Sequence, residues 1–361
     1  MTRARLADIA AHAGVSEATV SRVLNDKPGV APTTRQAVLT AVDVLGYDRP
    51  TKLRRKAVSL VGLVMPELEN PVFPAFAQII ETTLANHGYT PVLCTQTPGG
   101  VHEDDYVDML LDRGVAGIIF VSGLHADTTK EPDRYQRLLD RGLPIVLVNG
   151  YLPGLEAPFI STDDAAAMEL AVRHLATLGH TKIGLAVGPA RFVPVVRKMA
   201  GFVKAQQAIL QRDEAEVPII NTLFSVEGGA SAAKQLIEAG CTAIVSGSDM
   251  MALGAIRQAR TLGLAVPDDI SVVGYDDSPL MAFTDPPLTT VRQGVREMAE
   301  EAVRTLLDVV AGHPLPPGEL IFRPDLVVRN STGVAARRPV DGASAVDVAG
   351  SLSRIPAPGH R

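Results

Sequence analysis

Residues 6–25, LADIAAHAGVSEATVSRVLN, constrain the fold of this chain more than any other segment. Apolar residues recur there at helical spacing in two short runs, and Gly14 between the runs permits a tight turn. One face of the first run is formed by Leu6, Ile9, Ala10 and Ala13. The pattern therefore predicts two short helices that meet at a sharp turn.

The second of these helices has a small apolar face and a larger polar one. Ser16 is a favourable N-cap for it. The residues that point inward are Val20, Val23 and Leu24. The outer face carries Glu17, Ala18, Ser21, Arg22 and Asn25. A helix of this kind presents its outer face to a partner. This is the arrangement of the helix-turn-helix motif, in which the second helix enters a DNA major groove. The spacing alone fits a plain helical hairpin at a domain edge equally well.

Two further observations favour the DNA-binding alternative. Residues 33–45 form a third apolar stripe through Val38, Val42 and Leu45, so three helices can bury one another. The first 60 residues hold ten Lys or Arg and five Asp or Glu, a net charge of +5, whereas the whole chain carries −6. A basic segment on an acidic chain is typical of an electrostatic contact confined to that segment.

The remaining composition excludes several classes of protein. No apolar run reaches the roughly 18 residues of a membrane span, and no signal-peptide core precedes the helical segment, which predicts a cytoplasmic protein. Metal-ligand spacings and the phosphate-binding loop GxxxxGK[ST] are missing, so we expect no metal and no cofactor. Cys94 and Cys241 lie in apolar runs and are expected to be buried thiols in a reducing compartment.

Past residue 57, continuous apolar runs alternate with helical stretches. The apolar runs are 59–65, 91–94, 116–121, 143–148, 182–187, 242–246 and 271–275. The helical stretches include 76–88, 163–179 and 251–263. Buried runs that alternate with helices predict parallel sheets with helices on both faces, which is a doubly wound α/β fold.

Many of these runs end in small or polar residues. Examples are Pro66-Glu67, Ser122-Gly123, Asn149-Gly150, Ser248-Asp249 and Asp276-Asp277-Ser278. Ligands of doubly wound sheets bind outside the carboxyl ends of the strands, so a cleft for a polar ligand is predicted. A sugar suits this chemistry, because carboxylates accept from neighbouring hydroxyls and aromatic rings cover apolar sugar faces. Asp276 is the best candidate acceptor, although Asp276 or Asp277 could instead cap a helix.

The amino-acid sequence also resembles the lactose/galactose repressor family (LacI–GalR), from Leu6 to Tyr47 and again from Val58 to about Thr332. GVSEATVSRVLN, VAPTTRQAV and LGY resemble the headpiece of that family. VGLVMPELENPVF, TLGHTKIG, SDMMALGAI, ISVVGYDD and DPPLTTVRQ resemble signatures of its core, in the family's order. RLADIAAHAGVSEATVSRVLNDKPGVA and RFVPVVRKMAGF are similar to a narrower group, the maltose-utilisation repressors of actinomycetes.

The resemblance implies an all-α helix-turn-helix headpiece joined to a periplasmic-binding-protein-like core of two doubly wound parallel-sheet subdomains. The boundaries it implies are 1–47 for the headpiece, 48–57 for a basic hinge, 58–330 for the core and 331–361 for a tail. The first core subdomain is expected at about 58–160 plus 291–322, and the second at about 161–290 plus 323–330. The tail is expected to be disordered. It has no leucine heptads, so we expect a dimer rather than a tetramer.

The resemblance also assigns DNA contacts. Base edges are expected to be read by Glu17, Ala18 and Arg22, with Arg22 bidentate to guanine and Glu17 accepting from cytosine. Phosphate contacts are expected from Ser16, Thr19, Ser21, Asn25, Thr34 and Tyr47. In the hinge, Leu53, followed by Arg54, takes the place of a minor-groove leucine when counted back from Gly62. Counted forward from Tyr47 that place falls on Lys56, and a basic tether on phosphates remains the alternative.

The effector residues implied by the resemblance are Phe73, Asn149, Arg197, Lys198, Phe224, Ser248 and Asp276. Asp276 matches the family's ligand-binding aspartate. Lys198 replaces an arginine clamp, so either Lys198 or its neighbour Arg197 serves.

Four of these positions leave alternatives open. Asn149 stands where many relatives have aspartate. Ser248 stands where asparagine is frequent, and Asp249 beside it could cap the next helix. Phe224 is either a cleft aromatic or a core residue, and Phe73 is either a cleft aromatic or a hydrophobic staple on the following helix.

The sequence thus predicts a sugar-responsive transcriptional repressor. An enzyme is not expected, because neither a nucleophile–base pair nor a phosphate loop is found. The expected partners are double-stranded operator DNA, a small sugar with a maltose-type disaccharide as first choice, and a second copy of the chain, but no membrane. A sugar-binding protein without a role in DNA regulation is the alternative.

Overall fold

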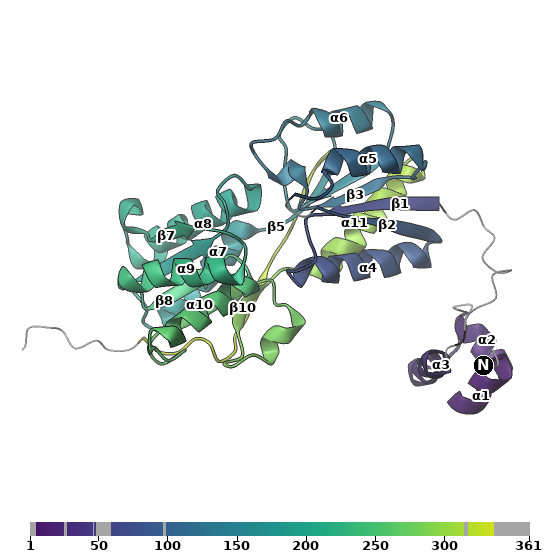
Figure 1. Cartoon of the computed structure of the whole chain (residues 1–361), viewed down its shortest axis with the longest axis horizontal. Helices are drawn as coiled ribbons and strands as arrows, with labels where there is room; N and C mark the ends of the chain where they lie inside the picture. Colours follow the sequence, from purple (N-terminus) through teal and green to yellow (C-terminus); the bar gives the residue numbers. More distant parts are fainter. Residues whose placement is uncertain are drawn as a thin grey trace, which may run out of the picture. The chain divides into compact units, whose positions relative to one another are not determined.

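A computed structural model of the chain describes residues 5–24, 27–45, 47, 59–96, 99–313 and 317–335 (Figure 1). The chain divides into two compact units, residues 1–58 and 59–361. The first unit holds the predicted headpiece and the second the predicted core, and each is described by itself below.

The headpiece contains three helices, α1 (Leu6–Ala13), α2 (Glu17–Leu24) and α3 (Pro32–Val44). Their shared core is formed by Ile9, Ala10, Val20, Val23, Val38 and Ala41. Gly14 has a φ of +65°, a left-handed conformation that favours glycine, and it ends α1. The Ser16 hydroxyl accepts from the Thr19 backbone N–H at 3.2 Å, so the predicted N-cap is confirmed. The predicted third helix begins one residue earlier, at Pro32, because proline fits the first turn of a helix.

The core contains two sheets of six strands each (Figure 1). The first has the order β11-β5-β4-β3-β1-β2. Its strands are β1 (Ser59–Met65), β2 (Tyr89–Thr95), β3 (Ile118–Val121), β4 (Ile145–Val148), β5 (Pro158–Thr162) and β11 (Gly318–Phe322). The second has the order β12-β10-β9-β8-β6-β7. Its strands are β6 (Ile183–Val187), β7 (Ile219–Asn221), β8 (Ala243–Ser246), β9 (Ser271–Tyr275), β10 (Thr289–Arg292) and β12 (Asp325–Val327).

Helices cover both faces of each sheet, and each sheet with its helices is called a subdomain below. The first subdomain packs α4 (Val72–Asn86) and α11 (Val295–Val310) on one face, and α5 (Glu103–Asp112) and α6 (Asp133–Asp140) on the other. The second packs α7 (Asp164–Thr177) and α8 (Val193–Leu210) on one face, and α9 (Val226–Glu238) and α10 (Asp249–Thr261) on the other. Three short 3₁₀ turns complete the core, at Leu124–Ala126, Glu214–Glu216 and Pro279–Ala282.

Both sheets share one strand order. The second strand of each pairs with one side of the first strand, and all later strands are added on the other side of the first strand. All neighbouring strands of the first sheet pair in parallel, whereas in the second sheet β12 pairs antiparallel with β10. The expected doubly wound fold is therefore confirmed. In such a sheet the carboxyl ends of the parallel strands meet at one edge.

The chain passes between the two subdomains three times. It crosses from β5 to α7, from β10 to α11, and from β11 to β12. Chain crossings between two subdomains are common in proteins that close around a ligand by a hinge motion.

The seven predicted apolar runs all contain strands, but five further strands were missed. These are β5, β7, β10, β11 and β12, which have three to five residues each and mixed polarity. The helix predicted to begin at residue 76 begins at Val72, because Pro74 is tolerated in a first helical turn.

Close packing of two glycines positions the starts of α9 and α10. A Cβ on Gly229 would lie 2.1 Å from the Met251 carbonyl oxygen, and a Cβ on Gly254 would lie 1.9 Å from that of Val226. The two helices therefore approach backbone to backbone, which fixes their N-terminal ends side by side.

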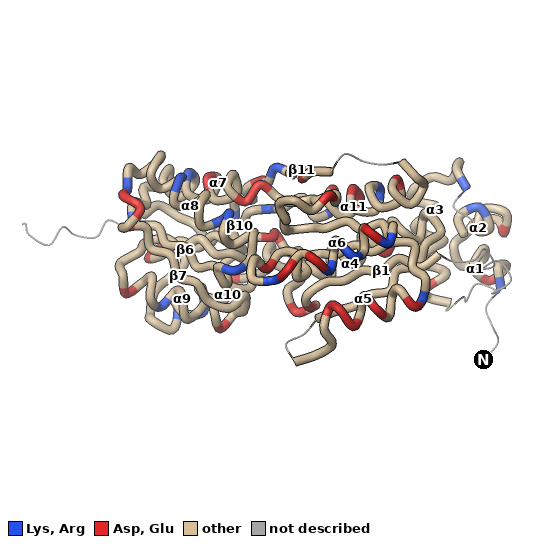
Figure 2. Tube along the Cα trace, turned by 90° about the horizontal axis from the view of Figure 1, so that it is seen from above, with Lys and Arg blue, Asp and Glu red and all other residues tan. Residues whose placement is uncertain are grey.

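Charge is distributed unevenly over the core (Figure 2). Helix α5 holds five Asp or Glu and no Lys or Arg among its ten residues. None of the helices in the described part of the chain is long and apolar enough to span a membrane.

Candidate functional site

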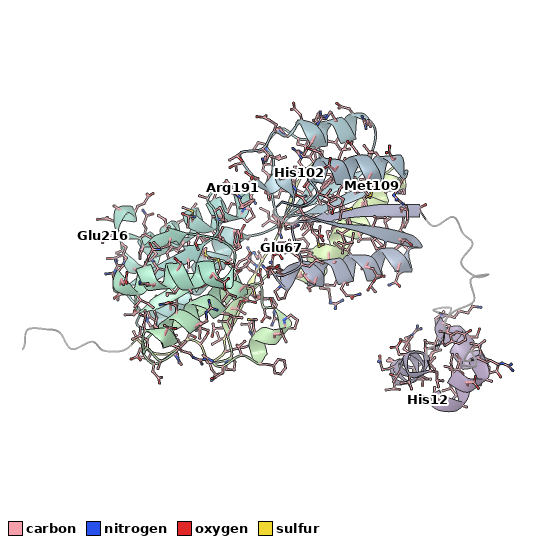
Figure 3. All side chains as sticks on the ribbon, viewed as in Figure 1. His12, Glu67, His102, Met109, Arg191 and Glu216 are labelled. Atoms are coloured by element: carbon pink, nitrogen blue, oxygen red, sulfur yellow. The ribbon has the colours of Figure 1, made fainter. Side chains whose placement is uncertain are left out.

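A cavity of about 1050 Å³ lies where strand ends and helix starts of the two core subdomains meet. Its lining includes all seven residues predicted to bind the effector, namely Phe73, Asn149, Arg197, Lys198, Phe224, Ser248 and Asp276. Figure 3 labels Glu67, which follows β1 and also lines the cavity. These residues are far apart in the sequence, so only the parallel topology brings them together.

The backbone is strained at three places in the cavity wall. Ser122, Asn149 and Asp276 have φ values of 48°, 62° and 119°, in the left-handed region that side-chain-bearing residues rarely adopt. They follow the strands β3, β4 and β9, respectively. Strained residues of this kind cluster at binding sites, where the surrounding fold holds a side chain in a direction that an extended backbone would not give.

Aromatic rings from both subdomains contribute to the cavity. Phe73 lies in the first turn of α4 and packs partly against the core of the first subdomain. It is inside the helix, so it is not a staple residue placed before it. Phe224 is 41 % exposed and packs on the backbone of Gly188, where a Cβ would lie 2.2 Å from its ring. Its ring centroid lies 6.3 Å from that of Phe192, and the alternative of a core phenylalanine is wrong.

Asp276 is buried, and its two carboxylate oxygens differ in their contacts. Oδ1 accepts from the Gln293 side-chain amide at 2.7 Å, whereas Oδ2 makes no hydrogen bond of good geometry among the described residues, and the Asn70 side chain lies near enough to favour the charged form. Burial, reinforced by the nearby charge of Asp249, holds the pKa of Asp276 well above its usual range. Asp276 does not cap a helix, and neither does Asp277, whose carboxylate pairs with Arg292 at 2.7 Å and Arg329 at 2.6 Å.

The two basic residues predicted as clamps are both engaged by carboxylates. Lys198 is 5 % exposed, and its ammonium pairs with the buried Asp164 and lies 3.9 Å from the centroid of the Tyr275 ring. Arg197 makes a bidentate pair with Glu319 of β11, at 2.6 and 2.9 Å. Lys198 therefore lines the cavity as a donor whose charge is balanced by Asp164. Arg197 links α8 to the edge strand of the other subdomain.

Ser248, rather than Asp249, caps helix α10. The Ser248 hydroxyl caps α10 by accepting from the Met251 N–H at 3.3 Å. The prediction that Asp249 could be this cap is wrong. Asp249 is fully buried and accepts from the Ser278 N–H at 2.7 Å and the Thr290 hydroxyl at 2.6 Å. Burial raises the pKa of Asp249 to about 6.

Contacts across the cleft join the subdomains on the side of α8. The Thr128 N–H donates to the Arg191 carbonyl at 2.8 Å, and the Arg191 guanidinium donates to Asp127 at 3.1 Å. Arg191, labelled in Figure 3, precedes α8 in the second subdomain, whereas Asp127 follows the first 3₁₀ turn in the first. The described structure therefore holds the two subdomains against each other near the cavity.

Several cavity residues were missed by the sequence reasoning. Asn70, Ser161, Asp164, Tyr275 and Gln293 line it as well. Tyr275 and Ser161 belong to strands, where an apolar pattern conceals them. Gln293 directly follows the four-residue strand β10, and the rule that strand ends bear ligand contacts would have found it had that strand been recognised.

In the headpiece, the predicted base-reading residues Glu17, Ala18 and Arg22 are exposed on α2, opposite the buried Val20 and Val23. Ser16 and Thr19 share a hydrogen bond of 2.9 Å between their hydroxyls at the start of the helix. The other predicted phosphate contacts that the structure describes, Ser21, Thr34 and Tyr47, are partly buried. Asn25, Leu53, Arg54 and the rest of the hinge lie outside the described residues, as does the tail from residue 336.

Metal and thiol chemistry find no support among the described residues. No group of three or more His, Cys, Asp or Glu side chains is placed to hold a metal ion there. Cys94 and Cys241 are buried free thiols, and burial raises the pKa of each to about 11.

Two family descriptions match the chain. "Bacterial regulatory proteins, lacI family" matches residues 5–50, and "Periplasmic binding protein-like domain" matches residues 172–332. The HTH-type transcriptional regulator MalR of Streptomyces coelicolor is 63 % identical over 92 % of this chain and 97 % of its own length. The chain belongs to the lacI family of transcriptional regulators. The family resemblance of the sequence is thus confirmed.

Solved structures agree with this assignment. The transcriptional regulator CelR in complex with cellobiose is 29 % identical, with a TM-score of 0.68 over 91 % of this chain and all of that one. The Lac repressor dimer bound to operator and the anti-inducer ONPF is 29 % identical, with a TM-score of 0.67 over 92 % of this chain and all of that one.

The buried carboxylate of Asp276 gives a testable effect on stability. Asp276→Asn keeps the acceptor for Gln293 and removes a buried charge, so at pH 7 the variant is expected to be more stable by at least about 1 kcal/mol. Because the folded-state pKa of Asp276 is raised, this carboxyl group costs the wild type stability as the pH rises from about 4, and the variant lacks that contribution, so the stability difference between the two proteins should grow with pH. The measurement is the free energy of unfolding in urea from pH 4 to 8.

Asp108→Asn, on the exposed side of α5, is the control and should follow the wild type. A stability difference between Asp276→Asn and wild type that stays constant over this pH range would contradict the assignment of a raised pKa.

Proposed function

We propose that this lacI-family regulator binds a palindromic operator as a dimer in the cytoplasm, and that a small neutral sugar in the core cavity controls its DNA affinity. The observation that carries the proposal is the cavity itself, in which hydrogen-bonding side chains and aromatic rings from two hinged subdomains converge. The exposed polar face of α2 supplies the output surface.

The charges around the cavity favour a neutral ligand over a phosphorylated one. Its lining has three basic residues, and each is paired with a carboxylate: Arg197 with Glu319, Lys198 with Asp164 and Arg257 with Glu227. Glu67, Glu69 and Asp276 add further carboxylates to the lining. Among the described residues that line the cavity, a phosphate would therefore meet a negative field without a free cation, whereas hydroxyl groups can donate to these oxygens.

A disaccharide of the maltose type is the first choice of ligand. The cavity volume of about 1050 Å³ lies at the upper end of the range of roughly 300–1,000 Å³ for small-molecule sites. The similar CelR structure contains cellobiose, which is a disaccharide. The maltose type rests on the resemblance to maltose-utilisation repressors.

Control of DNA binding follows from the three crossings between the subdomains. A ligand that contacts both subdomains favours their closed arrangement. Closure then moves the N-terminal end of the core, where the hinge to the headpiece begins, relative to the same end of the second copy in the dimer. Such a change is allosteric only if operator DNA lowers sugar affinity by the same factor as sugar lowers operator affinity.

A dimer would bury the apolar side chains that the core leaves exposed. Phe283 is 85 % and Leu280 65 % exposed, and both lie at the 3₁₀ turn between β9 and β10. Exposed apolar patches of this kind mark protein interfaces. The similar Lac repressor structure is a dimer on its operator.

The proposed ligand class is tested by release of DNA in a gel shift. Genomic fragments that the protein retains are incubated with maltose, trehalose, cellobiose and glucose 6-phosphate. A neutral disaccharide is expected to release the DNA, because its hydroxyls match the carboxylates, while the phosphate has no effect. Release by the phosphate alone would overturn the neutral-ligand assignment. Sugar binding by a protein that retains no fragment would favour the alternative of a sugar-binding protein.

The base-reading face of α2 is tested with Arg22→Ala. Loss of a bidentate contact to guanine is expected to weaken operator binding about 5- to 150-fold and to relax the preference at one base pair. Fluorescence anisotropy with operator and single-base variants provides the measurement. Arg296→Ala, which removes an exposed arginine on α11, should bind as wild type does. Unchanged affinity and base preference for Arg22→Ala would exclude Arg22 as a base contact.

The proposed dimer surface is tested with Phe283→Asp. A charge at this exposed ring is expected to convert the dimer to a monomer in sedimentation equilibrium and to weaken operator binding, since one headpiece then binds one half-site. Val334→Asp, at another exposed apolar residue just after the core, should leave the dimer intact. A Phe283→Asp protein that remains dimeric would show that the interface lies elsewhere.

A further inference from the structure

Ser161 has a side chain whose environment is unusual for a buried serine. It is the penultimate residue of β5, it is 3 % exposed, and it lines the cavity. Its hydroxyl has no hydrogen-bond partner among the described residues. A buried hydroxyl without a partner lowers the stability of the folded state, so such groups usually have a partner that the protein itself does not supply.

Among the described residues that line the cavity, two have a buried side-chain atom without a hydrogen-bond partner. They are Ser161 with Oγ and Asp276 with Oδ2. Ser161 belongs to the sheet of the first subdomain, and Asp276 follows β9 of the second. The two unpaired atoms therefore come from opposite sides of the hinge.

A hydrogen-bonded chain links the neighbourhoods of these two residues. The Thr162 hydroxyl, next to Ser161, donates to the Gln293 side-chain oxygen at 3.2 Å. The Gln293 amide nitrogen donates to Asp276 Oδ1 at 2.7 Å. Thr162 ends β5 and Gln293 follows β10, so each lies at a crossing between the subdomains. Gln293 thus occupies one oxygen of Asp276 and leaves Oδ2 available, as Ser161 Oγ is.

We propose that Ser161 is a ligand contact that acts together with Asp276 and selects a ligand with at least two hydroxyl groups. One ligand hydroxyl donates to Asp276 Oδ2. Another accepts from, or donates to, the Ser161 hydroxyl, which can do both. This inference rests on the proposed function, because it concerns the same cavity and names a residue that sets its specificity.

The arrangement gives Ser161 an effect on coupling as well as on affinity. A ligand held by Ser161 from one subdomain and by Asp276 from the other contacts both sides of the hinge. Removal of the Ser161 hydroxyl removes one of the contacts that the first subdomain makes to the ligand, so each bound ligand favours closure less. The sugar concentration needed to release operator DNA should therefore increase in the variant.

The test compares Ser161→Ala with wild type and with Ser246→Ala. Ser246 is the matched control, because it ends β8, is fully buried and has an unpartnered hydroxyl, but is not part of the cavity lining. Affinity is measured by isothermal titration with whichever of maltose, trehalose and cellobiose binds the wild-type protein most tightly. Unfolding midpoints without sugar are measured in parallel.

Both variants are expected to fold with midpoints equal to or above that of wild type, because each loses an unpaired buried hydroxyl. Ser161→Ala is expected to weaken sugar binding about 5- to 15-fold and to raise the sugar concentration for operator release at least as much, whereas Ser246→Ala matches wild type. The double variant Ser161→Ala/Asp276→Asn should lose less than the sum of the single effects, since both residues hold one ligand.

Ser161→Ala with wild-type sugar affinity would overturn the assignment of Ser161 and leave the proposed function intact. Equal losses of affinity in Ser161→Ala and Ser246→Ala would also overturn it, since they would show a general effect of altered strands. A wild-type protein that binds none of the three sugars would instead contradict the proposed function, and the inference with it.

Discussion

Parallel pairing of the strands is the constraint on which the functional features of the core depend. In each sheet the parallel strands point the same way, so the residues that follow them gather at one edge. Ser122, Asn149, Gly247 and Asp276 are close in space for this reason, although more than 150 residues of sequence separate the first from the last. Three crossings of the chain then join the two sheets.

The same geometry creates an electrostatic conflict at the cleft. Four carboxylates or ammonium groups are buried there, those of Asp164, Lys198, Asp249 and Asp276. Lys198 neutralises Asp164, and hydrogen bonds from Ser278 and Thr290 satisfy Asp249. Asp276 keeps one unpaired oxygen, with its pKa raised by burial and by Asp249. A protein tolerates the loss of stability from an unpaired buried oxygen where that oxygen can bind a ligand.

The sequence predicted the elements with a regular apolar pattern and missed the strands of mixed polarity. Ile9, Val20 and Val38 form the headpiece core as the helical spacing predicts, because an apolar stripe leaves few ways to pack three short helices. The seven longest apolar runs contain strands, whereas β10 and β12 were missed. A short strand of mixed polarity gains its stability from neighbours in the sheet, which a local pattern does not contain.

Prediction of the site shows the same division. The seven residues predicted to bind the effector line one cavity, and family resemblance together with the rule for strand ends was sufficient to place them there. The partners of these residues were not predictable. Lys198 pairs with Asp164 and Arg197 with Glu319, 34 and 122 positions away. Ser248 rather than Asp249 caps α10, because Asp249 turns inward to donors that follow β9 and lie on β10.

By itself, therefore, the sequence determined which segments are helical or extended, that a basic helical headpiece precedes an acidic α/β core, and which residue types collect at strand ends. These properties depend on spacing and composition, which are local. The tertiary structure alone decided which of those polar groups are already paired and which remain available to a ligand. Ser161 and Asp276 show why: whether a buried polar atom has a partner depends on side chains brought from distant parts of the chain.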